Sequence, residues 1–161
     1  FFLPYLSGER TPHNDPYIRG SFHSMKTTTS STNLQYAVIE GISFGILDGV
    51  NSILKVNNNF EKIFMVGGGS KSKFWIELLA SLLNRKLSVC DQSEFGAALG
   101  VARLAMYVDK NIDKKENIIK EINVSKSFTP KQDKIDLLLK RYNIWRDIYS
   151  SNKKIASNLL T

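Results

Sequence analysis

Residues 66–75 read VGGGSKSKFW, with three consecutive glycines between an apolar run and a helix-like pattern. The run KIFMV at 62–66 predicts a strand buried on both faces, and SKFWIELLASLLN at 72–84 has the apolar spacing of a helix. Glycine lets the chain turn sharply and lets a ligand reach the backbone. Because a helix N-terminus carries unpaired N–H groups and a partial positive charge, this junction suits a nucleotide. A tight turn without a ligand explains the glycines equally well.

A second strand, KLSVC at 86–90, follows that helix. Residues 62–90 therefore predict a strand–helix–strand unit with a right-handed crossover, and so an α/β fold. In open α/β sheets the ligand lies beyond the carboxyl ends of the strands. The glycine turn has neither the G-x-G-x-x-G spacing of dinucleotide-binding folds nor the G-x-x-x-x-G-K-[ST] spacing of P-loop proteins. The turn alone therefore does not identify a ligand.

A long helix is expected over about residues 33–56. Thr32 and Gln35 have the spacing of a capping box. Three glycines recur every four residues on one face of this helix, and each costs about 1 kcal/mol against alanine in a helix interior. Their register predicts that another backbone packs very close to this face. They are Gly41, Gly45 and Gly49.

The other segments carry weaker signals. Residues 20–25 are a short strand candidate, and 96–107 predict a helix whose small residues suit close packing. The polar, lysine-rich stretch 109–128 indicates a linker. A last helix is expected to begin at the capping-box pair Thr129 and Gln132 and to fray over its final dozen residues.

Composition argues against several classes of function. No apolar run approaches the roughly 20 residues of a membrane span. The net charge of +7 comes from lysines interspersed with acidic residues, which is typical of solvated helix faces, so nucleic-acid binding is not expected. The single Cys90 forms no internal disulfide, fits a cytoplasmic protein, and is expected to be buried. His13 and His23 lack the partners of a metal site, so no metal ligands are expected.

Longer motifs resemble a known family. The stretch FLPYLSGERTPHNDPYIRGSFHSM at 2–25, followed by AVIEGISFGILDG at 37–49, resembles the C-terminal half of the FGGY carbohydrate kinases. VGGGSKSKFW matches the adenosine motif of that family, and EFGAALGVARLA at 94–105 matches its last conserved helix. Ser24 departs from the pattern, which usually has glycine there. The LSGERTPHNDP wording is most similar to that of the xylulokinase branch.

The resemblance implies part of the C-terminal, ATP-binding lobe of a two-lobed actin/hexokinase-like (ribonuclease H-like) ATPase. It covers residues 1–108 well, and residues 109–161 are expected to be a linker and a helix that packs on the same lobe. Sugar would bind mainly to the missing N-terminal lobe. The resemblance further implies how this chain holds ATP. Gly68 and Gly69 would lie against adenine and ribose, Ser72 would hydrogen-bond the adenine edge, and Gly67 and Ser70 would complete the turn.

The resemblance assigns no catalytic residue to this chain. The general base of the family is an aspartate in a Gly-Asp context that would precede Phe1, and Mg²⁺ would be held largely outside these residues. Glu9 and Arg10 are expected to form a buried ion pair that orders their loop, in preference to lining the cleft between the lobes. The chain alone is expected to be inactive and to expose the Phe1–Leu6 segment. Four acidic residues receive no catalytic role: Asp15, Asp48, Asp91 and Glu94.

The expected function is transfer of the ATP γ-phosphate to D-xylulose, giving D-xylulose 5-phosphate. Two alternatives stay open: another FGGY kinase acting on gluconate, ribulose or another polyol, and a non-catalytic nucleotide-binding module. A Rossmann-type methyltransferase could use Asp91 after the second strand, but the GERTP segment has no place in that fold. Whether the protein forms a homodimer is left open.

Overall fold

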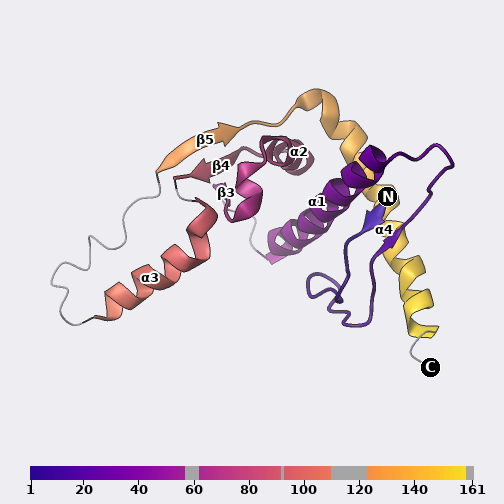
Figure 1. Cartoon of the computed structure of the whole chain (residues 1–161), viewed down its shortest axis with the longest axis horizontal. Coiled ribbons are helices and arrows are strands. Elements are labelled where there is room, and N and C mark those ends of the chain that lie inside the picture. Colours follow the sequence, from indigo (N-terminus) through magenta and orange to yellow (C-terminus); the bar gives the residue numbers. More distant parts are fainter. Residues whose placement is uncertain (57–61, 92, 110–122, 159–161) are drawn as a thin grey trace.

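The computed structural model describes residues 1–56, 62–91, 93–109 and 123–158 of the 161-residue chain. This part contains a two-stranded sheet, a three-stranded sheet and four α-helices (Figure 1). In chain order the elements are β1 (Phe2–Leu3), β2 (Ser21–Phe22), α1 (Ser31–Val56), β3 (Ile63–Met65), the 3-10 helix η1 (Gly68–Lys71), α2 (Lys73–Leu83), β4 (Leu87–Cys90), the 3-10 helix η2 (Ser93–Phe95), α3 (Gly96–Val108), β5 (Val124–Phe128) and α4 (Gln132–Asn158).

The predicted strand–helix–strand unit is confirmed. β3 and β4 run parallel, with Ile63 opposite Leu87, and α2 connects them between the N-cap Ser72 and the left-handed C-cap Asn84. Within the described residues β3 is an edge strand, so its side chains are only half-buried and the burial expected on both of its faces is not found. α2 packs on the sheet with one face and on α1 and α4 with the other. The sheet-side residues are Ile76, Leu79 and Ala80, and the helix-side residues are Leu78 and Leu82.

The expected linker contains a strand. β5 pairs antiparallel with β4, with Leu87 opposite Phe128, and the register shifts between Val89 and Cys90. The side chains of β5 are exposed except at the half-buried Phe128. Main-chain pairing rather than an alternating apolar pattern therefore defines this strand. Residues 110–122 of the expected linker lie outside the described part.

α1 begins two residues earlier than expected and uses a different cap. The Asn33 N–H donates to Ser30 Oγ at 3.2 Å, and the Ser30 N–H donates to Asn33 Oδ1 at 3.0 Å. The predicted Thr32–Gln35 capping box is therefore wrong, although the spacing of the true pair is the same.

The three glycines of α1 differ in how closely another segment approaches them. A Cβ at Gly41 would lie 2.1 Å from the backbone oxygen of Phe2, so β1 does press against the helix there. At Gly45 the nearest atoms are at 3.8 Å, which is ordinary contact. At Gly49 no described atom lies within 4 Å. The close approach is confirmed at one of the three positions.

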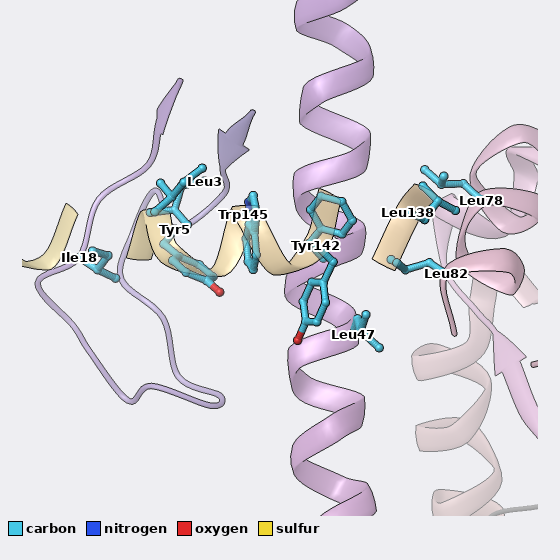
Figure 2. Close-up of a cluster of buried hydrophobic side chains, with 11 residues drawn as sticks. Leu3, Tyr5, Ile18, Leu47, Leu78, Leu82, Leu138, Tyr142 and Trp145 are labelled. Atoms are coloured by element: carbon cyan, nitrogen blue, oxygen red, sulfur yellow. The ribbon is translucent and has the colours of Figure 1, made fainter. Parts of the chain in front are cut away.

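The central helix of the core is α4. Figure 2 shows that the core side chains lie along this helix, from Leu3 and Ile18 at one end to Leu78 and Leu82 at the other. Trp145, 1% exposed, lies between these ends and donates from Nε1 to the Phe2 oxygen at 2.8 Å.

Three expectations about the chain termini are therefore wrong. Most of the Phe1–Leu6 segment is not bare, because Phe2, Leu3 and Tyr5 are buried beneath α4. The last helix does not fray at residue 150, because it continues to Asn158 and buries Ala156. It also begins at Gln132, which the expected capping box with Thr129 would place in the third helical position.

Two acidic residues of α1 are buried and paired with α4. Glu40, 1% exposed, accepts from Nε and Nη2 of Arg141 at 2.6 and 2.7 Å, and Asp48 accepts from the Tyr142 hydroxyl. By length and composition α1 could cross a membrane, a test that core helices of water-soluble proteins also pass. The buried, paired carboxylates of α1 are those of a core helix.

The GERTP loop is ordered by its own backbone. Glu9 and Asp15 exchange main-chain hydrogen bonds of 2.7 and 2.8 Å, and Glu9 Oε2 accepts from the His13 N–H at 2.8 Å. Arg10 is exposed. The expected buried Glu9–Arg10 pair is therefore wrong, because the Glu9 carboxylate binds its own loop instead.

α3 extends away from the rest of the molecule (Figure 1). No residue of α3 is buried by the parts of the chain that the structure describes. The close packing expected of its small residues is found at Gly96, where a Cβ would lie 3.1 Å from Cβ of Val66, and not at Gly100, where a Cβ would meet no described atom within 4 Å. The exposed apolar side chains of α3 include Val101, Leu104 and Val108.

Candidate functional site

The glycine turn lies where the sequence places it, between the carboxyl end of β3 and the amino end of α2. Gly67 has φ +81° and ψ −171°, a left-handed φ that favours glycine. The single turn η1 follows, and Ser72 then caps α2. The five residues predicted to hold a nucleotide, Gly67 to Ser70 and Ser72, are thus gathered in one turn.

The three glycines are explained by three different features. Gly67 has the positive φ. A Cβ at Gly69 would lie 2.6 Å from Cζ3 of Trp75, so Gly69 makes room for a side chain of this chain. Gly68 has neither property: its φ is not positive, it is exposed, and a Cβ there would meet no described atom within 4 Å. Gly68 is therefore the position whose bare backbone is open to a ligand.

Ser70 joins the glycine turn to η2. Its Oγ donates to the Gly67 oxygen at 2.7 Å and lies 2.8 Å from Oγ of Ser93. The Gly67 N–H also donates to the Ser93 oxygen at 2.8 Å. Ser70 and Ser93 are both buried, so this network is shielded from water. Ser70 stabilises the turn from inside and does not face the open side.

The sequence reasoning missed Ser93. Its signal is positional: β3 and β4 are parallel, so the segments that follow them meet at the same edge of the sheet. A polar residue three positions after the second strand was therefore a candidate to contact the glycine turn.

Ser72 remains available to a ligand while it caps α2. Its side chain is exposed, and its Oγ accepts from the Trp75 N–H at 3.3 Å. A serine hydroxyl accepts with its lone pairs and still has one hydrogen to donate. Ser72 can therefore donate to an acceptor above the turn, as the edge of an adenine ring would require.

The electrostatics of the turn favour binding rather than proton transfer. The N–H groups at the start of α2 and the partial positive charge of the helix suit an anion. Lys71 and Lys73 add positive charge, although Lys73 also lies 3.7 Å from Glu77. Among the described residues no three His, Cys, Asp or Glu side chains gather to hold a metal ion. Burial, and then the Asp91 carboxylate, raise the pKa of the nearby Cys90 thiol, which disfavours the nucleophilic thiolate.

Two of the acidic residues that received no catalytic role have structural partners. Burial raises the pKa of Asp15, but hydrogen bonds from the N–H groups of Tyr17 and Ile18 and from the Tyr149 hydroxyl outweigh it, so the pKa is lowered. Burial, and then Asp48, raise the pKa of Tyr142 to about 12. Asp91 is exposed, and the side chain of Glu94 lies outside the described part.

These features define a class of domain: an α/β unit that offers an open, backbone-lined turn at the carboxyl edge of a parallel strand pair. Residues 1–108 match the C-terminal domain of the FGGY family of carbohydrate kinases. The chain belongs to this family of ATP-dependent sugar kinases. The family and the fold class expected from the sequence are thereby confirmed. The boundary expected between residues 108 and 109 stays a prediction.

Three known proteins show the extent of the similarity. A xylulose kinase of Staphylococcus epidermidis is 34% identical over 161 residues, 99% of this chain and 32% of that protein. A crystal structure of a Brucella ovis protein described as a xyloylose kinase is 32% identical, with a TM-score of 0.81 over 96% of this chain and 32% of that one. A gluconate kinase structure from Lactobacillus acidophilus is 28% identical, with a TM-score of 0.73 over 94% and 30%. The chain spans about a third of the length of these proteins.

Proposed function

We propose that this chain is the nucleotide-binding part of a cytoplasmic kinase that transfers the γ-phosphate of ATP to D-xylulose. The observation that carries the nucleotide site is the exposed backbone of Gly68 at the amino end of α2, where a Cβ would meet no described atom within 4 Å. The choice of sugar is supported by the xylulose kinase relatives and by the LSGERTPHNDP wording of residues 6–16.

The residues of this chain would bind and orient ATP, and ATP would supply the phosphoryl group. Gly68 and Gly69 would lie against the adenosine, and Ser72 would donate a hydrogen bond to the adenine edge. Gly67 and Ser70 would set the shape of the turn, as their mutual hydrogen bond supports. Mg²⁺, the general base and the sugar site would come from the remainder of a kinase about three times as long.

The nucleotide site is tested by filling the open space at Gly68 in the full-length protein. Gly68→Val should weaken ADP binding at least about tenfold in isothermal titration, because the side chain would occupy the face proposed for adenosine. Gly49→Val is the matched control, since that glycine also has open space around it but lies on α1. Equal ADP affinity of Gly68→Val and the wild type would contradict the site.

The sugar is tested separately with a panel of xylulose, ribulose, gluconate and glycerol. The proposal predicts the highest kcat/KM for D-xylulose, and a higher value for gluconate would move the protein to the second candidate, which the gluconate kinase structure supports. The isolated 161 residues should phosphorylate none of these sugars, because they lack the proposed base and sugar site. Turnover by the isolated chain would contradict that division of roles.

A further inference from the structure

Trp75 contacts the glycine turn with both its backbone and its side chain. Its N–H donates to Oγ of Ser72 at 3.3 Å. Its indole ring lies against Gly69, where a Cβ would come within 2.6 Å of Cζ3 and 3.1 Å of Cε3. The ring thus occupies the place that a side chain at Gly69 would take, and the Gly69 backbone lies against the six-membered ring of the indole.

The indole is itself held by α1. Its Nε1 donates to Oγ of Ser43 at 2.9 Å, although the two residues are 32 positions apart. Ser43 is fully buried, and its hydroxyl donates to the Ile39 oxygen at 2.7 Å. Because that bond uses the only hydrogen of the hydroxyl, its lone pairs are aimed toward Trp75. Trp75 also packs against the apolar cluster between α2 and the sheet.

The glycine turn is therefore supported from two sides. Ser93 holds it through Ser70 and Gly67, and Trp75 holds it through Gly69 and Ser72. Gly68 lies between these supports, and a side chain there would meet no described atom. The position of the Gly68 backbone is thus set by its neighbours, and Trp75 is the larger of the two supporting side chains.

We infer that Trp75 is a positioning residue for the nucleotide, and that Ser43 of α1 sets its position. The inference rests on the proposed function, since it concerns the same turn. The indole fixes where the Gly68–Gly69 backbone meets adenosine, and the Ser43 hydroxyl fixes the indole. ATP affinity therefore depends on a hydroxyl in the core that does not line the turn.

The first test observes Trp75 directly. The full-length protein is labelled with 5-fluorotryptophan, and the Trp75 signal is assigned by its loss in Trp75→Phe. Titration with ADP should shift this fluorine resonance. The Trp145 signal should stay in place, because that indole is bonded to Phe2 in the core around α4. An unmoved Trp75 resonance at saturating ADP would overturn the inference.

The second test removes one oxygen atom from the core. Ser43→Ala leaves Nε1 of Trp75 without its acceptor and should raise the KM for ATP about fivefold, the value of one hydrogen bond. The KM for the sugar and kcat should stay within about twofold, because only nucleotide positioning is altered. Ser52→Ala is the matched control: that serine also donates to the carbonyl four residues earlier in α1, at 3.0 Å, but does not contact Trp75.

A double-mutant cycle shows whether Ser43 acts through the indole. Trp75→Phe keeps an aromatic ring near Gly69 but has no N–H, so Ser43→Ala should have no further effect on the KM for ATP in that background. Additive effects of the two substitutions, or equal effects of Ser43→Ala and Ser52→Ala, would overturn the inference.

Failure of the inference can be told from failure of the proposed function. If Gly68→Val abolishes ADP binding, while Ser43→Ala leaves the KM for ATP unchanged and ADP does not shift the Trp75 resonance, the nucleotide site is supported and the positioning role of Trp75 is wrong. If Gly68→Val leaves ADP affinity unchanged, the site itself is wrong, whatever Trp75 does.

Discussion

Alanine substitutions at two glycines of α1 should change stability in opposite directions. At Gly41 a Cβ would lie 2.1 Å from the Phe2 oxygen, and at Gly49 no described atom lies within 4 Å. Since both positions are inside the same helix, both substitutions gain the same helix propensity, about 1 kcal/mol. The difference between them therefore measures the contact between α1 and β1.

The cost at Gly41 follows from what the Phe2 carbonyl already does. To reach an ordinary carbon–oxygen distance it must move by roughly 1 Å, in a core where overpacking costs about 1–3 kcal/mol. The same oxygen accepts from Nε1 of Trp145 at 2.8 Å, and a buried N–H that loses its partner costs about 1–3 kcal/mol. Less the propensity gain of about 1 kcal/mol, Gly41→Ala should destabilise by about 3 kcal/mol.

Urea unfolding of the full-length protein measures both effects. Gly49→Ala should be about 1 kcal/mol more stable than the wild type, so the two variants should differ by about 4 kcal/mol. In 5-fluorotryptophan-labelled protein, Gly41→Ala should also shift the resonance of Trp145 and leave that of Trp75 in place. Shifts in stability of the same sign, or a Gly41→Ala variant as stable as the wild type, would refute the reasoning.

Two sets of substitutions and one chemical modification test the other buried groups. Arg141→Met leaves Glu40 buried without a partner and should lower the free energy of unfolding in urea by about 2–4 kcal/mol, less than for a fully buried pair because the Arg141 side chain is 36% exposed. Adding Glu40→Gln should recover part of this loss, and an Arg141→Met variant as stable as the wild type would contradict the pairing. The lowered pKa of Asp15 contributes stability that is complete above its unfolded pKa of about 3.9 and is lost as pH falls through the folded pKa. Tyr149→Phe removes one hydrogen bond to this carboxylate, so its loss of unfolding free energy relative to the wild type at pH 7 should shrink in acid. A loss that grows in acid would contradict the prediction. Burial raises the pKa of Cys90, so iodoacetamide should modify it slowly in the folded protein and rapidly in urea, and equal rates would contradict its burial.

The parts of the fold that the sequence predicts are those with a local cause. The spacing of apolar residues in α2 is set by the two faces it buries, and Ser72 caps it through the next turn of the same chain. The positive φ of Gly67 is a local need of the turn as well. β5 has no such signal, because its exposed side chains need not alternate and its pairing partner lies more than 30 residues away.

The errors arise where a distant segment decides the outcome. The sequence does not show that Trp145 covers Phe2, since 143 positions separate them. Ser93 is likewise tied to the glycine turn only by the parallel pairing of β3 and β4. At the start of α1 two pairs of residues have the same capping spacing, and spacing alone does not choose Ser30 and Asn33.

Contacts with distant segments also distinguish a glycine needed for packing from one proposed to contact a ligand. Gly41 and Ser43 are two residues apart, so they point about 200° apart around α1. One side of the helix presses on Phe2 and the other holds Trp75 beneath the glycine turn. Gly41 therefore serves packing, and the contact of α1 with Trp75 is made by a serine that no glycine motif marks. Of the three glycines in the turn, only Gly68 has a bare backbone that neither its own conformation nor a described neighbouring atom explains, and its place at the amino end of α2 is the physical basis for locating the nucleotide there.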